Sequence, residues 1–217
     1  MSNLKEKILA KYAKLAENFE EAQNKGLALF GVDEKALRKE TIDALCLKEG
    51  DTVLEIGCGT GSNFSFLEEK VGDFGKIIGV DISLPMLKQA EKRIKKEGWK
   101  NIELLEGDLM DVGDLDKVHG VLCTFSACLF EDLDAIMIKI SSVLVPGGKL
   151  SVVDVKLLRG WKAFINPWIV HFSKIYGGNK RTYKNDLGVA MQGSYDPIHT
   201  RELKKGVIYL ASGVLKE

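Results

Sequence analysis

The sequence predicts an α/β domain built on a mostly parallel β-sheet, and two observations carry this prediction. Short apolar segments alternate with amphipathic ones between residues 51 and 156, as they do where helices connect neighbouring parallel strands. The first of these segments leads into VLEIGCGTG at residues 53–61, where a buried strand reaches an acid and turns through three glycines into a helix. We expect one domain over 1–217, because this length suffices for one buried core and is short for two.

The first part of the chain, residues 1–48, is expected to be helical. Residues 2–24 carry apolar side chains at close to helical spacing among many charges, which predicts one amphipathic helix. A second helix should begin after Asp33 as its N-cap and run to about Cys46. Its inward positions should be Ala36, Leu37, Ile42 and Leu45.

Residues 49–156 should form the cofactor-binding core, in which strands and helices alternate. The expected strands are 51–56, 76–81, 101–106, 118–124 and 149–156. The expected helices are 61–71, 83–97 and 132–145. The stretch MDVGDLDK after the third strand is short and acidic, so a helix there is poorly marked.

The last part, residues 157–217, is expected to hold a variable substrate region and a terminal hairpin. Segment 157–195 is aromatic and irregular. Two candidate strands follow at 198–204 and 206–212, joined by a tight turn.

Composition excludes several classes of function. Thirty-one basic and thirty-one acidic residues give no net charge, so a nucleic acid partner, which normally needs a basic face, is not expected. The four cysteines form no C-x-x-C pair, which favours a reduced chain and no metal site. No signal peptide and no run of eighteen apolar residues occurs, so we expect a cytoplasmic protein that is at most peripheral to a membrane.

The spacing of the glycines separates two kinds of cofactor. A dinucleotide fingerprint has the spacing G-x-G-x-x-G, and its third glycine stands at the helix that faces the pyrophosphate. Here the glycines alternate at Gly57, Gly59 and Gly61, and Ser62 occupies the next position. S-adenosylmethionine has no phosphate, so its site needs no pyrophosphate cradle. Together with Glu55, two residues before the first glycine, this spacing resembles the first motif of class I S-adenosylmethionine-dependent methyltransferases.

In an open parallel sheet, ligands lie outside the carboxyl ends of the strands, where the strand order reverses. At the end of the first strand, Glu55 and the glycine turn should meet the methionine part and the ribose. At the end of the second, Asp81 suits the ribose, because one carboxylate can accept hydrogen bonds from both hydroxyls. A dehydrogenase would place an acid at a similar point, so Asp81 alone does not separate the two classes.

The adenine should lie near the end of the third strand. Asp108 and the backbone amide of Leu109 could meet its edge, while Ile82 and Met86 could cover its faces. Alternatively, Asp108 only caps a turn.

At the end of the fourth strand, Thr124 and Phe125 would lie beside the sulfonium, with Ser126 close behind. Phe125 could equally be ordinary core.

From Tyr12 to about Lys156 the chain resembles, more narrowly, the menaquinone and ubiquinone biosynthesis methyltransferases and the bacterial phosphatidylethanolamine N-methyltransferases. The motifs that carry this resemblance are VLEIGCGTGSNF, VDISLPML, EGDLMD and LVPGGKL. It implies a Rossmann-like fold with a mostly parallel seven-stranded sheet, a C-terminal antiparallel hairpin and N-terminal helices. It also implies that an aromatic of the N-terminal helix, Tyr12 or Phe19, closes over the cofactor, and Asn63 follows the glycines as in that subgroup.

The residues expected to hold the cofactor are therefore Tyr12, Glu55, Gly57, Cys58, Gly59, Gly61, Asn63, Asp81, Ile82, Met86, Gly107, Asp108, Leu109, Thr124 and Phe125.

We expect methyl transfer from S-adenosylmethionine, with S-adenosylhomocysteine as product, to a small apolar or lipid-like acceptor. A quinone precursor and a phospholipid head group are the two candidates. A cofactor-binding partner protein without turnover and a nicotinamide-dependent oxidoreductase are the alternatives. A nucleobase is disfavoured, because CTFS stands where base-methylating enzymes carry (D/N)PP(Y/F).

A catalytic base is needed only if the acceptor must lose a proton. The weak candidates are His171, Tyr183 and His199, with Asp196 in the same region, and His119 should lie at the wrong end of the sheet.

Apolar side chains recur at spacings of three and four over residues 161–176 and are interrupted by Pro167, which should start a new helix. With Lys162 and Lys174 nearby, this stretch could touch a membrane or line an acceptor pocket. It could also be a lid packed on the sheet.

Overall fold

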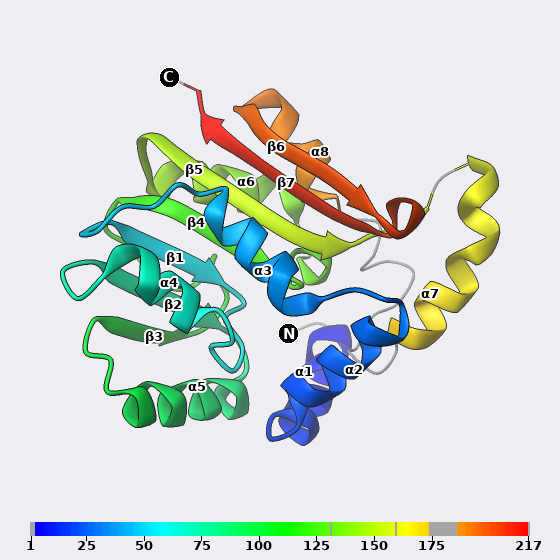
Figure 1. The fold of residues 1–217 in the computed structure, drawn as a ribbon, viewed down its shortest axis with the longest axis horizontal. Coiled ribbons are helices and arrows are strands. Elements are labelled where there is room, and N and C mark those ends of the chain that lie inside the picture. The colour runs from blue at the N-terminus through cyan, green and yellow to red at the C-terminus, as the bar shows by residue number, and fades with distance from the viewer. Residues whose placement is uncertain (1–2, 131, 159, 174–185, 217) are drawn as a thin grey trace.

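One seven-stranded sheet, in the order β3-β2-β1-β4-β5-β7-β6, organises the computed structural model, which describes residues 3–130, 132–158, 160–173 and 186–216 (Figure 1). The strands are β1 (Thr52–Ile56), β2 (Lys76–Asp81), β3 (Ile102–Glu106), β4 (Val118–Thr124), β5 (Leu144–Val155), β6 (Tyr195–Leu203) and β7 (Ile208–Leu215). Strands β1 to β5 pair in parallel, and β7 runs antiparallel between β5 and β6. The predicted mostly parallel sheet with a terminal hairpin is confirmed.

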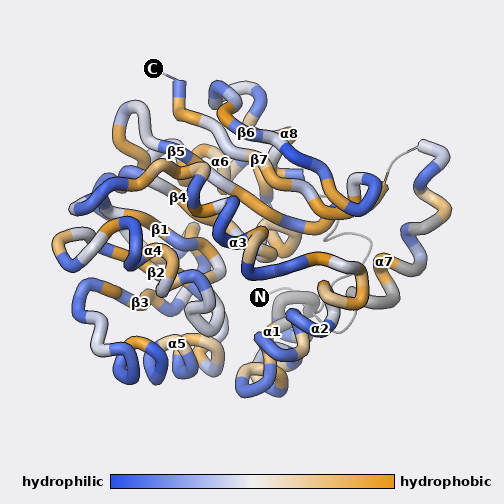
Figure 2. Tube along the Cα trace, viewed as in Figure 1, coloured by the Kyte–Doolittle hydropathy of each residue, from blue (hydrophilic) through white to orange (hydrophobic). Residues whose placement is uncertain are grey.

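Helices cover both faces of the sheet, which explains why its central strands are apolar along their length. On one face lie α3 (Glu34–Asp43), α4 (Phe64–Val71) and α5 (Leu84–Glu97), and on the other lie α6 (Leu133–Val143) and the short α8 (Leu187–Ala190). Successive residues of β1 alternate between them: Val53 packs in the cluster of α4 and α5, and Leu54 in that of α6. Figure 2 shows the apolar strands enclosed by helices with polar outer surfaces.

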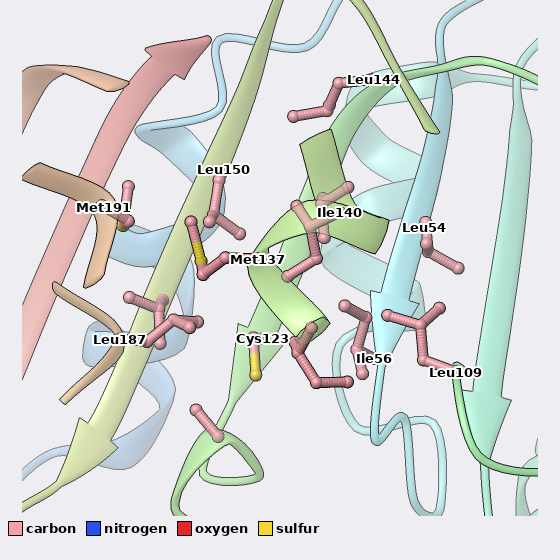
Figure 3. Close-up of a cluster of buried hydrophobic side chains, with 14 of the residues drawn as sticks. Leu54, Ile56, Leu109, Cys123, Met137, Ile140, Leu144, Leu150, Leu187 and Met191 are labelled. Carbon is pink, nitrogen blue, oxygen red and sulfur yellow. The ribbon is translucent and has the colours of Figure 1, made fainter. Parts of the chain in front are cut away.

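The core beneath α6 is closely filled. Met137 and Ile140 of α6 point toward Leu54, Cys123 and Leu150 of the strands (Figure 3). Truncating one such buried side chain typically costs about 2–5 kcal/mol, so this cluster holds the sheet rigid beneath its carboxyl ends.

The helix after Asp33 begins as predicted, because the Asp33 carboxylate accepts a hydrogen bond from the amide of Ala36 at 3.0 Å. It ends at Asp43, three residues before the expected Cys46. Leu37 and Ile42 are buried as expected, whereas the prediction for Ala36 is wrong, since this residue is exposed.

The single helix predicted for residues 2–24 is wrong. The chain forms α1 (Asn3–Leu15) and α2 (Phe19–Leu29), separated by a turn in which the amide of Asn18 bonds to the carbonyl of Leu15. Across this turn Tyr12 meets Phe19 edge-on, with ring centroids 5.6 Å apart. This aromatic contact joins the two helices into a pair that lies beside α3 and α5 (Figure 1).

Several other boundaries differ from expectation. Helix α4 begins at Phe64 rather than 61, and the hairpin strands are Tyr195–Leu203 and Ile208–Leu215 rather than 198–204 and 206–212. Strand β5 begins at Leu144 rather than 149, because Leu144 pairs with Val118 before an irregularity in the register, and α6 accordingly ends at Val143. No helix forms over residues 107–117, between β3 and β4, where the sequence marked one poorly.

The aromatic segment after β5 contains a short 3₁₀ turn, Gly160–Ile165, followed by α7 (Asn166–Ser173) and, after the undescribed residues, by α8. Pro167 stands at the start of α7, as expected. Among the described residues, no helix combines the length and apolar character needed to cross a membrane.

Candidate active site

A cavity of about 400 Å³ opens at the carboxyl ends of β1, β2 and β4. This is the point where the strand order reverses, since β1 pairs with both β2 and β4. Twelve of the residues that the sequence assigned to the cofactor line it: Tyr12, Gly57, Cys58, Gly59, Asp81, Ile82, Met86, Gly107, Asp108, Leu109, Thr124 and Phe125. Glu55, Gly61 and Asn63 do not line the cavity and lie behind its wall.

The three glycines of the turn after β1 all have positive φ, of 70°, 56° and 74° in chain order, which favours glycine at each position. A side chain on Gly57 would collide with Ser126, and a Cβ on Gly61 would lie 2.5 Å from the ring of Phe64. Gly59 differs, because a Cβ there would meet only the Met86 methyl, at 3.4 Å. Packing therefore excludes side chains at Gly57 and Gly61, while at Gly59 the space belongs to the cavity.

Asp81, at the end of β2, is held by both of its carboxylate oxygens. Oδ2 accepts a hydrogen bond from the amide of Gly59 and Oδ1 one from the amide of Ser83, each at 2.8 Å. Burial raises the pKa of Asp81, and these two amide bonds lower it in part. The carboxylate thus fixes the glycine turn while it faces the cavity with its remaining lone pairs.

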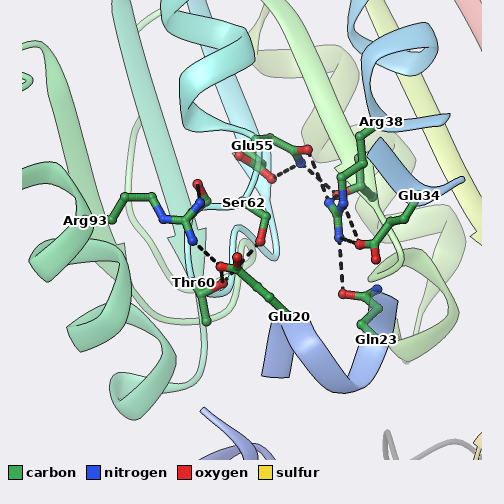
Figure 4. A network of polar contacts seen from close by, with 11 residues as sticks. Glu20, Gln23, Glu34, Arg38, Glu55, Thr60, Ser62 and Arg93 are labelled. Carbon is green, nitrogen blue, oxygen red and sulfur yellow. Dashed lines mark hydrogen bonds and ion pairs between the residues drawn. The ribbon is translucent and has the colours of Figure 1, made fainter. Parts of the chain in front are cut away.

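Behind the cavity lies a buried polar network centred on Arg38 of α3 (Figure 4). Its guanidinium donates to Thr124 at 2.8 Å, to Asn63 Oδ1 at 3.2 Å and to Glu34 at 2.7 Å. A fourth bond, of 3.2 Å, reaches Gln23 Oε1 on α2. Arg38 also lines the cavity, so it carries a positive charge to its wall from a fixed position.

Glu55 lies deeper in the same network. Its Oε1 accepts from Asn63 Nδ2 at 2.6 Å, and its Oε2 is buried with no hydrogen-bond partner among the described residues. Burial raises the pKa of Glu55 to about 7, although the Asn63 bond and the Arg38 charge oppose the rise. A carboxyl group whose pKa stands this high close to a cavity responds to any charge that binds there.

A second set of contacts ties α2 to the glycine turn. Glu20 accepts a hydrogen bond from Thr60 Oγ1 at 2.5 Å and pairs with Arg93 of α5 (Figure 4). Burial favours a higher pKa for Glu20, but the Arg93 and Thr60 bonds and the Arg93 charge bring it below its usual value. The helix pair that carries Tyr12 and Phe19 into the cavity is therefore anchored to the turn itself.

On the adenine side of the expected site, Ile82 and Met86 line the cavity beside Gly107, Asp108 and Leu109. Asp108 Oδ1 accepts from the amide of Met110 at 3.2 Å, so Asp108 caps a turn and faces the cavity at once. The turn cap is confirmed, and the contact of Asp108 with adenine stays a prediction.

Phe125 lines the cavity directly after β4 with a φ of 55°, which is unusual for a residue with a side chain. The Arg38 guanidinium lies over its ring, 5.3 Å from the centroid. Ser126, next in the chain, donates to the carbonyl of Ile56 at 2.7 Å and so joins the ends of β1 and β4.

The suggested catalytic bases are not brought to the cavity where they are described. His199 lies on the edge strand β6 with its Nε2 3.0 Å from Glu40, and Asp196 pairs with Lys216 at 3.8 Å. His119, near the start of β4, accepts from the amide of Thr52 at the far end of the sheet, as expected. The side chains of His171 and Tyr183 lie outside the described residues.

Sequence reasoning missed Arg38 and Gln23, which are both buried and both line the cavity. The pattern contained a signal for Arg38. Taking Leu37 and Ile42 as inward places Arg38 and Glu34 on the same face of the helix, and charged residues on a buried face are rare unless they are paired.

Comparisons with known proteins also indicate a methyltransferase domain. Residues 53–148 match the family model of a methyltransferase domain. A demethylmenaquinone methyltransferase of Listeria welshimeri is 29% identical over 143 residues, which cover 64% of this chain and 61% of that protein. The chain thus spans less than two thirds of the length of that curated relative.

Solved structures share the fold. A SAM-dependent methyltransferase from Aquifex aeolicus superposes with a TM-score of 0.67 at 21% identity, over 96% of this chain and 98% of that one. The geranyl diphosphate C-methyltransferase of Streptomyces coelicolor, solved with Mg²⁺, geranyl diphosphate and S-adenosyl-L-homocysteine, gives 0.68 at 16% identity over 84% and 79%.

The alternation of strands and helices, the glycine turn at the reversal point and the matched domain lead to one assignment. Residues 53–148 match a methyltransferase domain, and the chain has the fold of the class I S-adenosylmethionine-dependent methyltransferases.

Proposed function

We propose that this chain transfers the methyl group of S-adenosylmethionine to a small, largely apolar acceptor. The observation that carries the proposal is the pairing of Gly59 with Asp81 at the cavity wall. The turn is bare enough for a nucleoside to lie against it, and the carboxylate that fixes the turn has lone pairs for two ribose hydroxyls.

The lining residues fit the whole cofactor. Asp81 would hold the ribose, and Ile82 and Met86 would enclose the adenine, with Asp108 and the amide of Leu109 at its edge. The methionine end of the cofactor carries a carboxylate. The N–H groups of Arg38 already bond to Glu34, Asn63, Thr124 and Gln23, so this lining residue would act on that carboxylate through its positive charge. Glu55 would then lie on the side of the cofactor's ammonium and sulfonium charges, which favour its ionised form.

Methyl transfer depends more on the alignment of the two reactants and the exclusion of water than on a dedicated catalytic group. The S–CH₃ bond breaks with its electron pair going to sulfur, while a nucleophilic atom of the acceptor forms the new bond to carbon. Positive charge disperses as this happens, so exclusion of water and a fixed approach supply most of the acceleration. Tyr12, Phe19 and Phe125 are the lining residues that would enclose the reacting atoms.

An acceptor that carries a proton on the attacking group must release it during transfer. The carboxylates of Asp111 and Asp132 line the same cavity and are the described groups that could receive it. An acceptor whose attacking group is already ionised has no proton to release and needs neither carboxylate.

The acceptor side of the cavity is apolar, with Leu129, Phe130 and Ile136 in its wall. The relatives point the same way, because one is named for demethylmenaquinone and another was solved with geranyl diphosphate. We therefore place a quinone precursor first among the acceptors and a phospholipid head group second.

The test is a transfer assay with methyl-labelled S-adenosylmethionine. Reduced demethylmenaquinone with a short side chain and dispersed phosphatidylethanolamine serve as alternative acceptors, and mass spectrometry follows S-adenosylhomocysteine and methylated product together. We expect stoichiometric formation of both with the quinone. Tight cofactor binding with no product from either acceptor would favour the alternative of a partner protein without turnover, and binding of NADH in place of S-adenosylmethionine would favour an oxidoreductase.

A further inference from the structure

Three loops far apart in the sequence meet on one side of the molecule, at the right of Figure 1. They are the end of α2, the 3₁₀ turn Gly160–Ile165, and the turn Lys204–Gly206 between β6 and β7. The Lys204 ammonium lies so close to Gly31 that a Cβ on that glycine would be 3.4 Å from it. Lys162 of the 3₁₀ turn donates to the carbonyl of Lys205 at 3.5 Å. These contacts join the loops into one surface.

That surface exposes large apolar side chains. Leu29 is 82% exposed, Trp161 81% and Phe164 69%. Such side chains are normal singly, but together at the junction of three loops they mark an interaction site. We call this surface the basic apolar patch and define it by Leu29, Phe30, Trp161, Phe164, Lys204 and Lys205.

The charges of the patch are of one sign. Within the described part of the chain, no carboxylate forms an ion pair with Lys162, Lys204 or Lys205. The Glu202 carboxylate lies beside the turn, 3.1 Å from where a Cβ on Gly206 would stand, and it pairs with Lys156 at 3.0 Å. Lys204 and Lys205 also adopt left-handed φ values of 50° and 63°, which glycine or asparagine would adopt at lower cost. The turn thus holds two ammonium groups beside exposed aromatic side chains in a chain with no net charge.

The patch is connected to the cavity. Helix α2 has Phe19 and Gln23 in the cavity wall and Leu29 in the patch, about 15 Å further along its axis. An apolar cluster follows the same course, because Phe125 of the cavity packs in one cluster with Leu27 and Leu203. An apolar ligand that left a lipid surface at the patch would therefore contact apolar side chains on its way to the cavity.

We infer that the basic apolar patch docks on an anionic lipid surface, from which the acceptor enters the cavity. The inference rests on the proposed function for the identity of what enters, and on the patch alone for the docking. Exposed tryptophan and phenylalanine side chains insert at the boundary of head groups and acyl chains, and flanking lysines are attracted to anionic head groups. Among the roles that the sequence left open for residues 161–176, membrane contact is favoured over a packed lid. The reason is that Trp161 and Phe164 are exposed and not packed on the sheet.

The test measures co-sedimentation of the full chain with vesicles of phosphatidylglycerol and phosphatidylcholine, and with vesicles of phosphatidylcholine alone. Wild type should bind the anionic vesicles, and raising the salt to about 0.5 M should weaken that binding strongly. Trp161→Ala and Phe164→Ala should each weaken it about tenfold, since each removes a large buried apolar area. Lys204→Gln with Lys205→Gln should weaken it about 25-fold, from about fivefold for each lysine.

Phe74→Ala is the matched control, because Phe74 is 85% exposed in the loop between α4 and β2, away from the patch, and its removal should change nothing. Calorimetry with S-adenosylmethionine should give one affinity for all variants, which separates docking from the proposed function. The inference is overturned if wild type ignores anionic vesicles, or if the patch variants bind as wild type does. It is equally overturned if Trp161→Ala changes the oligomeric state without lipid, since the patch would then join copies of this chain.

Discussion

Replacing Gly59 by alanine tests the cavity wall with one methyl group. Gly59 has a φ of 56°, and a Cβ there would project into the cavity with only the Met86 methyl nearby, at 3.4 Å. A bound cofactor would have to share that space, and overpacking of this kind typically costs about 1–3 kcal/mol. We therefore expect the affinity for S-adenosylmethionine to fall about 5- to 150-fold.

The matched control is Gly113→Ala. Gly113 has a nearly equal φ of 55°, and a Cβ there would meet nothing within 4 Å. Both variants carry the same backbone strain, on the order of 1–2 kcal/mol, so both should lose similar stability in denaturant unfolding. Only Gly59→Ala should lose affinity in calorimetry. Wild-type affinity in Gly59→Ala, or an equal loss in Gly113→Ala, would refute the assignment of this wall to the cofactor.

The other predictions concern the charged groups. Asp81→Ala should weaken cofactor binding by about 1.5–3 kcal/mol in calorimetry, through the ribose bonds and the released amide of Gly59; an unchanged affinity would remove Asp81 from the site. Arg38→Met should weaken binding of S-adenosylmethionine about tenfold more than binding of its decarboxylated analogue, because the removed positive charge matters for a carboxylate; equal losses for both ligands would argue against that role. Burial raises the pKa of Glu55 from 4.5 to about 7, so the folded state binds this proton more tightly and loses up to about 3 kcal/mol as the pH rises through that window. Glu55→Gln should abolish this loss, so that unfolding free energies at about pH 5 and pH 8 differ less than in wild type; an undiminished difference would contradict the buried, protonated state.

Much of the fold could be predicted because local pattern and tertiary burial agree in the core. The strands that end at Ile56, Asp81 and Thr124 are apolar since helices cover both faces of the sheet, and the glycines beyond the first strand require positive φ. The cavity therefore lies where the sequence placed it.

What could not be predicted depends on contacts between distant segments. The break between α1 and α2 coincides with the packing of Tyr12 on Phe19, which helical periodicity over residues 2–24 does not contain. Arg38 was missed because all of its partners except Glu34 come from α2, the glycine turn and β4, which the sequence of α3 does not show.

A structure of the protein crystallised with S-adenosylhomocysteine tests the central claim most directly. We predict the ribose hydroxyls on Asp81, the adenine between Ile82 and Met86, and the sulfur facing Phe125. An empty cavity at saturating ligand, or a ligand bound elsewhere on the chain, would contradict the account.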